Sequence, residues 1–243
     1  MNLEETQANI LTGVFGKPGG DEEHFLEVHV DFEGLNERVE TVMTMRGGYD
    51  FYDQTPDGEY FAWASADDRM APEYLQRCCE ALDADEDAAL AYSWAKIVDP
   101  TGSVRRIHHD RRAPDSDDIV ERLRIAMYGI DLLNCLYGVM RRGAVQATGL
   151  LRNDMYAPDN LLIVELAMEG RFVQIEEPLF RRGMPGKSEK IFHRYERLDR
   201  TVFRPARRYT RQTPMCHLAG AHLDAIRHSR LTPEQKVELI GEM

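Results

Sequence analysis

The chain has 243 residues, 43% apolar and 30% charged, a composition typical of one compact domain with a sizeable buried core. Its net charge of −12 argues against nucleic-acid binding, because phosphate backbones are bound by clustered Lys and Arg. No run approaches the roughly 20 consecutive apolar residues of a membrane helix, and residues 1–20 lack the basic start and apolar run of a signal peptide. We therefore expect a cytoplasmic protein with no transmembrane segment and no nucleic-acid partner.

The first sixty residues indicate strands separated by turns. Residues 24–32 alternate apolar and polar side chains, as a strand does. Residues 10–15 could form an earlier strand, and residues 35–45 can be helical. Residues 59–64 (EYFAWA) are aromatic and small, which is typical of a buried strand. Two carboxylates, Asp67 and Asp68, follow this strand at its carboxyl end.

The remaining chain alternates helical and extended patterns. Residues 72–83 carry an apolar stripe behind Pro72 and predict a helix, and residues 88–98 predict a strand that ends in a turn at 99–102. Further helices are expected over 119–133, 141–149, 160–170, 218–227 and 233–240, and extended segments over 135–140, 171–175 and 178–182. This order predicts an α/β domain with a mainly parallel sheet, which binds ligands beyond the carboxyl ends of its strands.

Cysteine and histidine contribute no convincing metal site. The four cysteines lack CxxC spacing and are expected to be buried free thiols. His108 and His109, beside Asp110, could be taken for a metal cluster. Adjacent side chains in an extended segment point to opposite sides, however, and the Arg- and Asp-rich surroundings in a charged connector over residues 105–118 suggest a solvated loop.

Several blocks of this sequence resemble, in the same order, the family-two-like inverting glycosyltransferases of the GT-A fold. The blocks are 58–68 (GEYFAWASADD), 70–83 (MAPEYLQRCCEALD), 134–149 (NCLYGVMRRGAVQATG), 158–172 (PDNLLIVELAMEGRF) and 177–188 (EPLFRRGMPGKS). The resemblance covers about three quarters of the chain. It implies a single GT-A-like, Rossmann-related domain, in which residues 1–57 form a divergent part of the nucleotide-binding half and residues 58–243 form the core.

The same resemblance implies a nucleotide-diphosphate sugar donor held by Mg²⁺ or Mn²⁺, with Asp67 as the principal metal ligand and Asp68 in support. Such a cation neutralises the charge that develops on the diphosphate as the sugar bond breaks. Ser65 stands where many members carry another aspartate.

The resemblance also implies that Asp159, behind Pro158 at the start of a helix, is the residue that deprotonates the acceptor hydroxyl. Alternatively, Asp159 only caps the helix. Arg181, Arg182 and Lys187 are candidates for diphosphate binding, or else solvated residues of a loop.

Two departures from the family pattern affect the expected function. Many relatives carry a histidine where this chain has Met184, and methionine is a poor ligand for a hard cation. The family also opens with two strands, the second ending in an aspartate that binds the nucleotide. Here only about 57 residues precede the acidic motif, and Asp31, at the end of the strand over residues 25–32, is the candidate for that aspartate.

Trp63 could stack on a sugar or base, or could belong to the core. The leading interpretation is an inverting, metal-dependent transfer of sugar to an acceptor hydroxyl. The alternative is a non-catalytic or repurposed GT-A-like protein that binds a ligand or a partner enzyme, or forms a homo-oligomer.

Overall fold

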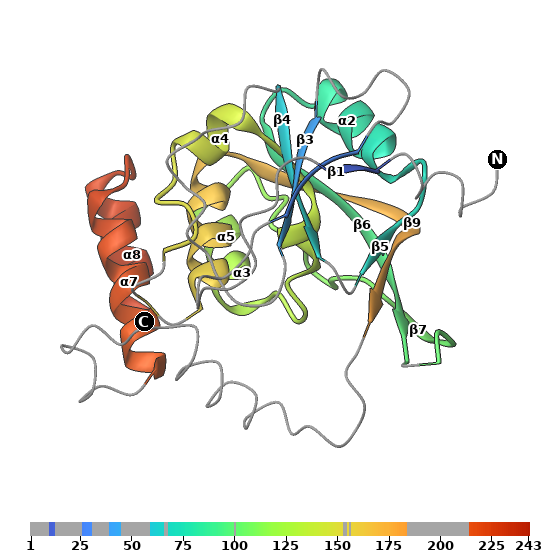
Figure 1. Cartoon of the computed structure of the whole chain (residues 1–243). Helices are drawn as coiled ribbons and strands as arrows, with labels where there is room; N and C mark the ends of the chain where they lie inside the picture. Colours follow the sequence, from blue (N-terminus) through green and yellow to red (C-terminus); the bar gives the residue numbers. More distant parts are fainter. Residues whose placement is uncertain are drawn as a thin grey trace, which may run out of the picture.

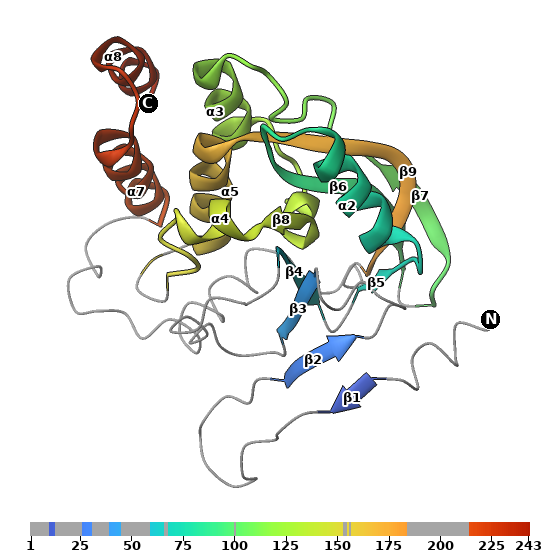
Figure 2. The ribbon, with the colours of Figure 1, turned by 90° about the horizontal axis from the view of Figure 1, so that it is seen from above.

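The structure is a computed structural model that describes residues 10–12, 26–30, 39–44, 59–65, 68–99, 101–152, 155, 157–183 and 214–243. In the three strands before residue 45, and at residues 64, 65 and 214, it describes the backbone alone. Among these residues one curved sheet crosses the molecule, with helices on both faces (Figures 1 and 2).

The sheet has the strand order β1-β2-β3-β4-β8-β6-β9-β5, with β7 pairing β6 beside this path. Its strands are β1 (Ile10–Thr12), β2 (Leu26–Val30), β3 (Val39–Thr44), β4 (Tyr60–Ser65), β5 (Arg69–Met70), β6 (Ala88–Val98), β7 (Val104–His108), β8 (Val139–Arg141) and β9 (Arg171–Gly183). The predicted α/β class is confirmed, but the prediction of a mainly parallel sheet is wrong. Only β3 with β4 and β6 with β9 are parallel among the described pairs, and the other pairs are antiparallel.

The sheet is mixed because one connection is a tight hairpin and one short strand enters antiparallel to both of its neighbours. The turn after Val98 returns the chain at once as β7, antiparallel to β6. The short β8 enters between β4 and β6 and runs antiparallel to both. Parallel neighbours need long crossovers, and only the connections that lead to β4 and to β9 place such neighbours side by side.

The helices divide between the two faces of the sheet (Figures 1 and 2). They are α2 (Tyr74–Ala84), α3 (Ile119–Tyr128), α4 (Arg142–Gln146), α5 (Pro158–Glu169), α7 (Pro214–His228) and α8 (Pro233–Gly241), with a 3-10 turn, η1 (Asn134–Tyr137). Helix α2 covers one face, and α3 and α5 cover the other. Helix α7 packs on α5 and α8 packs on α3, as an outer layer on that side.

Each face has its own apolar cluster because neighbouring residues of β6 point to opposite sides. Leu90 and Tyr92 pack with α3 and α5, whereas Ala91 and Ala95 pack with α2. The buried stripe of α2 that the sequence predicts is confirmed, since Tyr74, Leu75, Cys78, Cys79 and Leu82 are its buried residues.

Two elements differ from the sequence prediction. Residues 35–45 were expected to allow a helix, but Val39–Thr44 is β3 and pairs with β4 through the whole length of both strands. The charged connector expected over 105–118 begins as the strand β7. Four of the five residues of this strand are exposed, both arginines among them, while its backbone pairs with β6.

Strand β9 carries a bulge, and the side chains before and after it alternate between the two faces of the sheet in opposite order. Ile175 pairs with Ser93, and Phe180 pairs with Ala95, so two steps along β6 correspond to five along β9. Strand β9 thus has three more residues than β6 over this stretch. Because three is an odd number, the side chains that face a given side of the sheet are reversed across residues 176–179. Phe172 therefore belongs to the cluster under α3 and α5, while Phe180 belongs to the α2 cluster.

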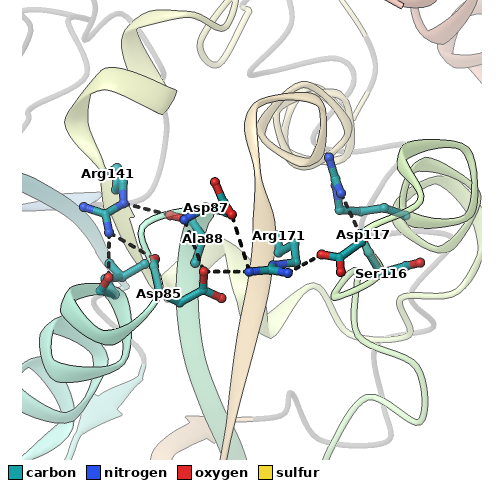
Figure 3. Close-up of polar contacts among 9 residues, drawn as sticks. Asp85, Asp87, Ala88, Ser116, Asp117, Arg141 and Arg171 are labelled. Carbon is teal, nitrogen blue, oxygen red and sulfur yellow. Dashed lines mark hydrogen bonds and ion pairs between the residues drawn. The ribbon is translucent and has the colours of Figure 1, made fainter.

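Two arginines fasten the amino ends of β6 and β9 to α2 and to the segment before α3 (Figure 3). Arg141 donates to the carbonyls of Ala88 and Leu82, at 2.8 and 2.6 Å. Arg171 donates to Asp85 Oδ1 at 2.8 Å and also to Asp117. Figure 3 shows the two guanidinium groups on either side of the turn that precedes β6.

Three of the four free cysteines are buried as expected, namely Cys78, Cys79 and Cys135, whereas Cys216 is exposed. Within the described ranges, no helix combines the length and the apolar character needed to cross a membrane.

Candidate functional site

Residues from two distant parts of the chain meet near the carboxyl ends of β4 and β9. Strand β5, directly after Asp68, pairs with the end of β9 through Arg69 with Arg181 and Met70 with Phe180. The backbone N–H of Gly183 donates a hydrogen bond to Asp68 Oδ1 at 2.9 Å, across 115 positions in the sequence. Asp68 is therefore held against the basic end of β9.

The two arginines at this end of β9 make different contacts, as consecutive strand residues do. The Arg181 guanidinium donates to the Gly102 carbonyl in the turn between β6 and β7. Arg182 donates to the Leu132 carbonyl and to Asn134 Oδ1, the latter at 2.7 Å, and lies 6.0 Å from the centroid of the Tyr137 ring. Each arginine still has further N–H groups to offer, because a guanidinium carries five.

Asp159 lies in the first turn of α5, directly after Pro158. Its Oδ1 accepts from the backbone N–H of Asn160 at 2.9 Å, so one oxygen makes a local helix-end contact of the kind that the capping alternative describes. Burial raises the pKa of the Asp159 carboxyl above its usual value, while the backbone N–H groups of Asn160 and Asp159 and the charge of Arg182 oppose the rise. A carboxylate with a raised pKa and a cation nearby has the electrostatics of a tunable acid or base.

Backbone strain accompanies both Arg182 and Asp159. Leu133 lies between the two residues that accept from Arg182, and it has φ 51. Ala157, two residues before Asp159, also has φ 51. A non-glycine residue in the left-handed region costs about 1–2 kcal/mol, and such strain gathers at functional sites.

The other candidate residues fall into two groups. Trp63 is 2% exposed and packs with Phe61 in the cluster under α3 and α5, at 4.7 Å between ring centroids, so the structure places it in the core. Asp31, Asp67 and Lys187, together with Met184, lie outside the described residues.

The described residues supply part of a donor set for a divalent cation. Asp68 offers carboxylate oxygen, the donor that Mg²⁺ and Mn²⁺ prefer. Within the described ranges no three His, Cys, Asp or Glu side chains gather closely enough to hold a metal by themselves.

Sequence reasoning missed a polar residue and misread a polar segment. Asn134 is 3% exposed and orients Arg182, but nothing in its local pattern distinguishes it from a turn residue. The prediction of a solvated loop at His108 and Asp110 is wrong, since both side chains are buried. Asp110 Oδ2 accepts from the Tyr92 hydroxyl at 2.8 Å, and this bond from the sheet allows the carboxyl group to be buried.

Comparison with known proteins finds structural but not sequence similarity. The sequence matches no protein-family model and no curated protein. The structure is similar to that of S. aureus TarS residues 1–349 in complex with UDP-GlcNAc, with a TM-score of 0.48 and 14% identity, over 77% of this chain and 48% of that one. The same fragment without a stated ligand gives a TM-score of 0.45 and 15% identity, over 77% and 46% of the two chains.

For the longer TarS structure the TM-score is 0.43 at 15% identity, and the match covers 77% of this chain and 28% of that one. The chain thus spans less than half the length of the TarS structures that it matches. At this level of similarity a functional argument has to come from the residues of this chain.

Proposed function

We propose that this protein transfers a sugar from a nucleotide-diphosphate donor to an acceptor hydroxyl, with inversion at the anomeric carbon. The observation that supports the proposal is the hydrogen bond from Gly183 N to Asp68 Oδ1, which joins the acidic motif to the arginine-bearing end of β9. A diphosphate leaving group needs a cation-binding carboxylate and positive side chains next to each other, and this contact supports the proposal because it joins the Asp68 carboxylate to the strand end that carries Arg181 and Arg182.

In the proposed site Asp68, together with Asp67, holds Mg²⁺ or Mn²⁺. When bound, the cation neutralises the negative charge that develops on the leaving diphosphate. Arg182 is the better placed of the two arginines for the diphosphate, because it shares the surroundings of Asp159. Arg181 and Lys187 belong to the same proposed binding loop.

Asp159 acts as the general base in this proposal. Its carboxylate accepts the acceptor hydroxyl proton as the hydroxyl oxygen forms a bond to the anomeric carbon and the bond to the diphosphate breaks. Attack from the face opposite the leaving group gives inversion. The raised pKa of Asp159 suits this role, because a base with a pKa closer to the working pH takes up a proton more readily.

The test uses substitutions that preserve the hydrogen bonds and remove the charge. In Asp68→Asn the amide oxygen can still accept from Gly183 N, so the fold contact remains while the anionic ligand is lost. Calorimetric titration with UDP, GDP and dTDP and their common sugar conjugates, with and without Mn²⁺, should show cation-dependent binding to the wild type that Asp68→Asn loses. UDP-GlcNAc belongs in this panel because it is the ligand of one TarS structure.

Asp159→Asn separates chemistry from binding. The Asn side chain still accepts from the Asn160 backbone, so donor binding should persist, while turnover falls about 10²–10⁴-fold. Glu169→Gln, at the exposed far end of the same helix, is the matched control and should change neither. If no nucleotide binds, or if Asp68→Asn binds as the wild type does, the non-catalytic or repurposed alternative replaces this proposal.

A further inference from the structure

A groove outside the candidate site opens beside the first half of β9. It has a volume of about 660 Å³ and is open to solvent. The side chains used below are Trp94 from β6, Gln174 and Glu176 from β9, and His109, Asp110 and Asp115 from the segment after β7. The Asp85 and Arg171 pair drawn in Figure 3 lines it at the amino ends of the two strands.

The groove is separate from the site around Arg182. Gln174 pairs with Tyr92, and Arg182 pairs with Ile97, so the two positions are five residues apart along β6, or about 17 Å. The bulge also places them on opposite faces. Tyr92 packs under α3 and α5, whereas Arg182 lies over Tyr137, whose ring stacks on Phe180 of the α2 cluster.

A directed chain of hydrogen bonds fixes the floor of the groove. Trp94 Nε1 donates to Gln174 Oε1 at 3.0 Å, Gln174 Nε2 donates to the Tyr92 hydroxyl at 2.8 Å, and this hydroxyl donates to Asp110 Oδ2 at 2.8 Å. Burial raises the pKa of the Tyr92 phenol far above its usual value, so it remains a donor. The Trp94 ring is therefore held in place before any ligand arrives.

The aromatic part of the groove is a pair of rings. The Trp94 and His109 centroids are 5.0 Å apart, and the rings are inclined by 34°. Trp94 is half-buried and His109 is exposed, so the pair offers an apolar edge next to polar groups. An amphipathic surface of this kind suits a ligand with C–H faces and hydroxyl rims.

The charged groups of the groove disfavour an anion. Four carboxylates line it, Asp85, Asp110, Asp115 and Glu176, against two guanidinium groups, Arg111 and Arg171. Arg171 is already paired with Asp85 at 2.8 Å. A neutral ligand that both donates to carboxylates and accepts from amide and guanidinium groups matches this set.

The floor also has an unused acceptor. Asp110 is 6% exposed, and its Oδ1 has no hydrogen-bond donor among the described residues. The ring nitrogen Nε2 of His108 lies 3.5 Å from this oxygen. A buried acceptor without a donor is costly, and a hydroxyl that reaches it on a small rearrangement would remove that cost.

We propose that this groove is a second binding site for an uncharged saccharide, with the Trp94 and His109 rings as its platform. The site goes beyond the proposed transfer activity and does not depend on it, because binding here involves neither Asp68 nor Asp159.

Trp94 provides the readout. The chain has two tryptophans, and the other, Trp63, is buried in the core, so a saccharide in the groove should change mainly the Trp94 fluorescence. We would titrate maltotetraose, cellotetraose and chitotetraose without nucleotide, and follow the same sugars by saturation-transfer NMR. At least one should give a saturable fluorescence change, and UDP should not displace it.

Variants then locate the binding. His109→Ala removes an exposed ring and should weaken binding about fivefold to tenfold, and Glu176→Ala should weaken it in the same direction. Lys96→Ala, an exposed change two residues from Trp94 that does not line the groove, should leave binding unchanged.

Three outcomes would overturn the proposal: none of the sugars binds, His109→Ala and Glu176→Ala bind as the wild type does, or binding is lost in Asp68→Asn. The last result would assign the sugar to the transfer site. Failure of the transferase proposal leaves the saccharide result unaffected, because no nucleotide or cation is present in this assay.

Discussion

Tyr92→Phe tests the buried polar chain that supports the groove. The Tyr92 side chain is 1% exposed, and its hydroxyl donates to Asp110 and accepts from Gln174, each at 2.8 Å. Removing one oxygen atom therefore leaves two partners without their bonds, one of them a carboxyl group. A buried polar group that loses its partner costs about 1–3 kcal/mol, and a charged one more, so we expect a loss of about 2–5 kcal/mol.

Urea unfolding followed by far-UV circular dichroism measures this loss directly. For a chain of this size, each kcal/mol lowers Tm by about 2–4 °C, so a thermal scan gives an independent estimate. Tyr128→Phe is the control, because that side chain is 59% exposed and its change should stay within about 0.5 kcal/mol.

A double-mutant cycle that combines Tyr92→Phe with Asp110→Asn should give a coupling free energy between the two side chains of about 1–3 kcal/mol. A Tyr92→Phe variant as stable as the Tyr128→Phe control would refute the reasoning, since the hydroxyl could not then be the bridge between two buried groups.

Three further predictions concern single residues. Burial lowers the pKa of His222 to about 4, so below about pH 6.5 the unfolded chain binds a proton that the folded chain does not. The free energy of unfolding should therefore fall as pH is lowered from about 6.5 through 4. In urea unfolding at several pH values, His222→Leu should remove up to about 3 kcal/mol of this acid sensitivity. Ala157→Gly relieves a positive φ and should raise stability by about 0.5–1 kcal/mol in thermal melts, whereas Gly102→Ala, at φ 84, should lower it. Because the pKa of Asp159 is raised, its ionised form destabilises the fold, and this penalty should grow as pH rises above 3.8 through the folded pKa. The rate of the proposed sugar transfer should rise over the same pH range, and Asp159→Asn should abolish both pH dependences.

Elements with strong local signals could be predicted closely from the sequence. Strand β6 has the predicted bounds, Ala88–Val98, because a run of small and apolar residues is stopped by Asp99 and Pro100. Helix α8 begins where Thr232 predicts, and the structure adds a capping box with Gln235. In both cases neighbouring residues alone determine the boundary.

The sequence prediction at β3 is wrong because the spacing of its apolar residues and the secondary-structure preference of its side chains point to different structures. The apolar spacing of residues 35–45 suits a helix, but four of the six residues in Val39–Thr44 are β-branched, namely Val39, Thr41, Val42 and Thr44. These side chains favour a strand, and parallel pairing with β4 decides the outcome. This pairing joins positions that no local window brings together.

The candidate site was only partly visible in the sequence for the same reason. The motif that contains Asp68 and the start of α5 at Asp159 could be recognised locally, but the contact between Asp68 and Gly183 spans 115 positions. The burial of Asp110 depends on a donor from Tyr92, on another strand. The change of phase in β9 was hidden as well, because residues on each side of the bulge alternate normally.

That bulge has a consequence for how the molecule can change over evolutionary time. In a strand with one continuous register, a slip of a single residue turns every side chain to the other face. In β9 the extra residues between Ile175 and Phe180 can absorb a slip, so an insertion or deletion on one side need not reorient the other. The groove residues and the arginines near Gly183 can therefore diversify independently although they share one strand.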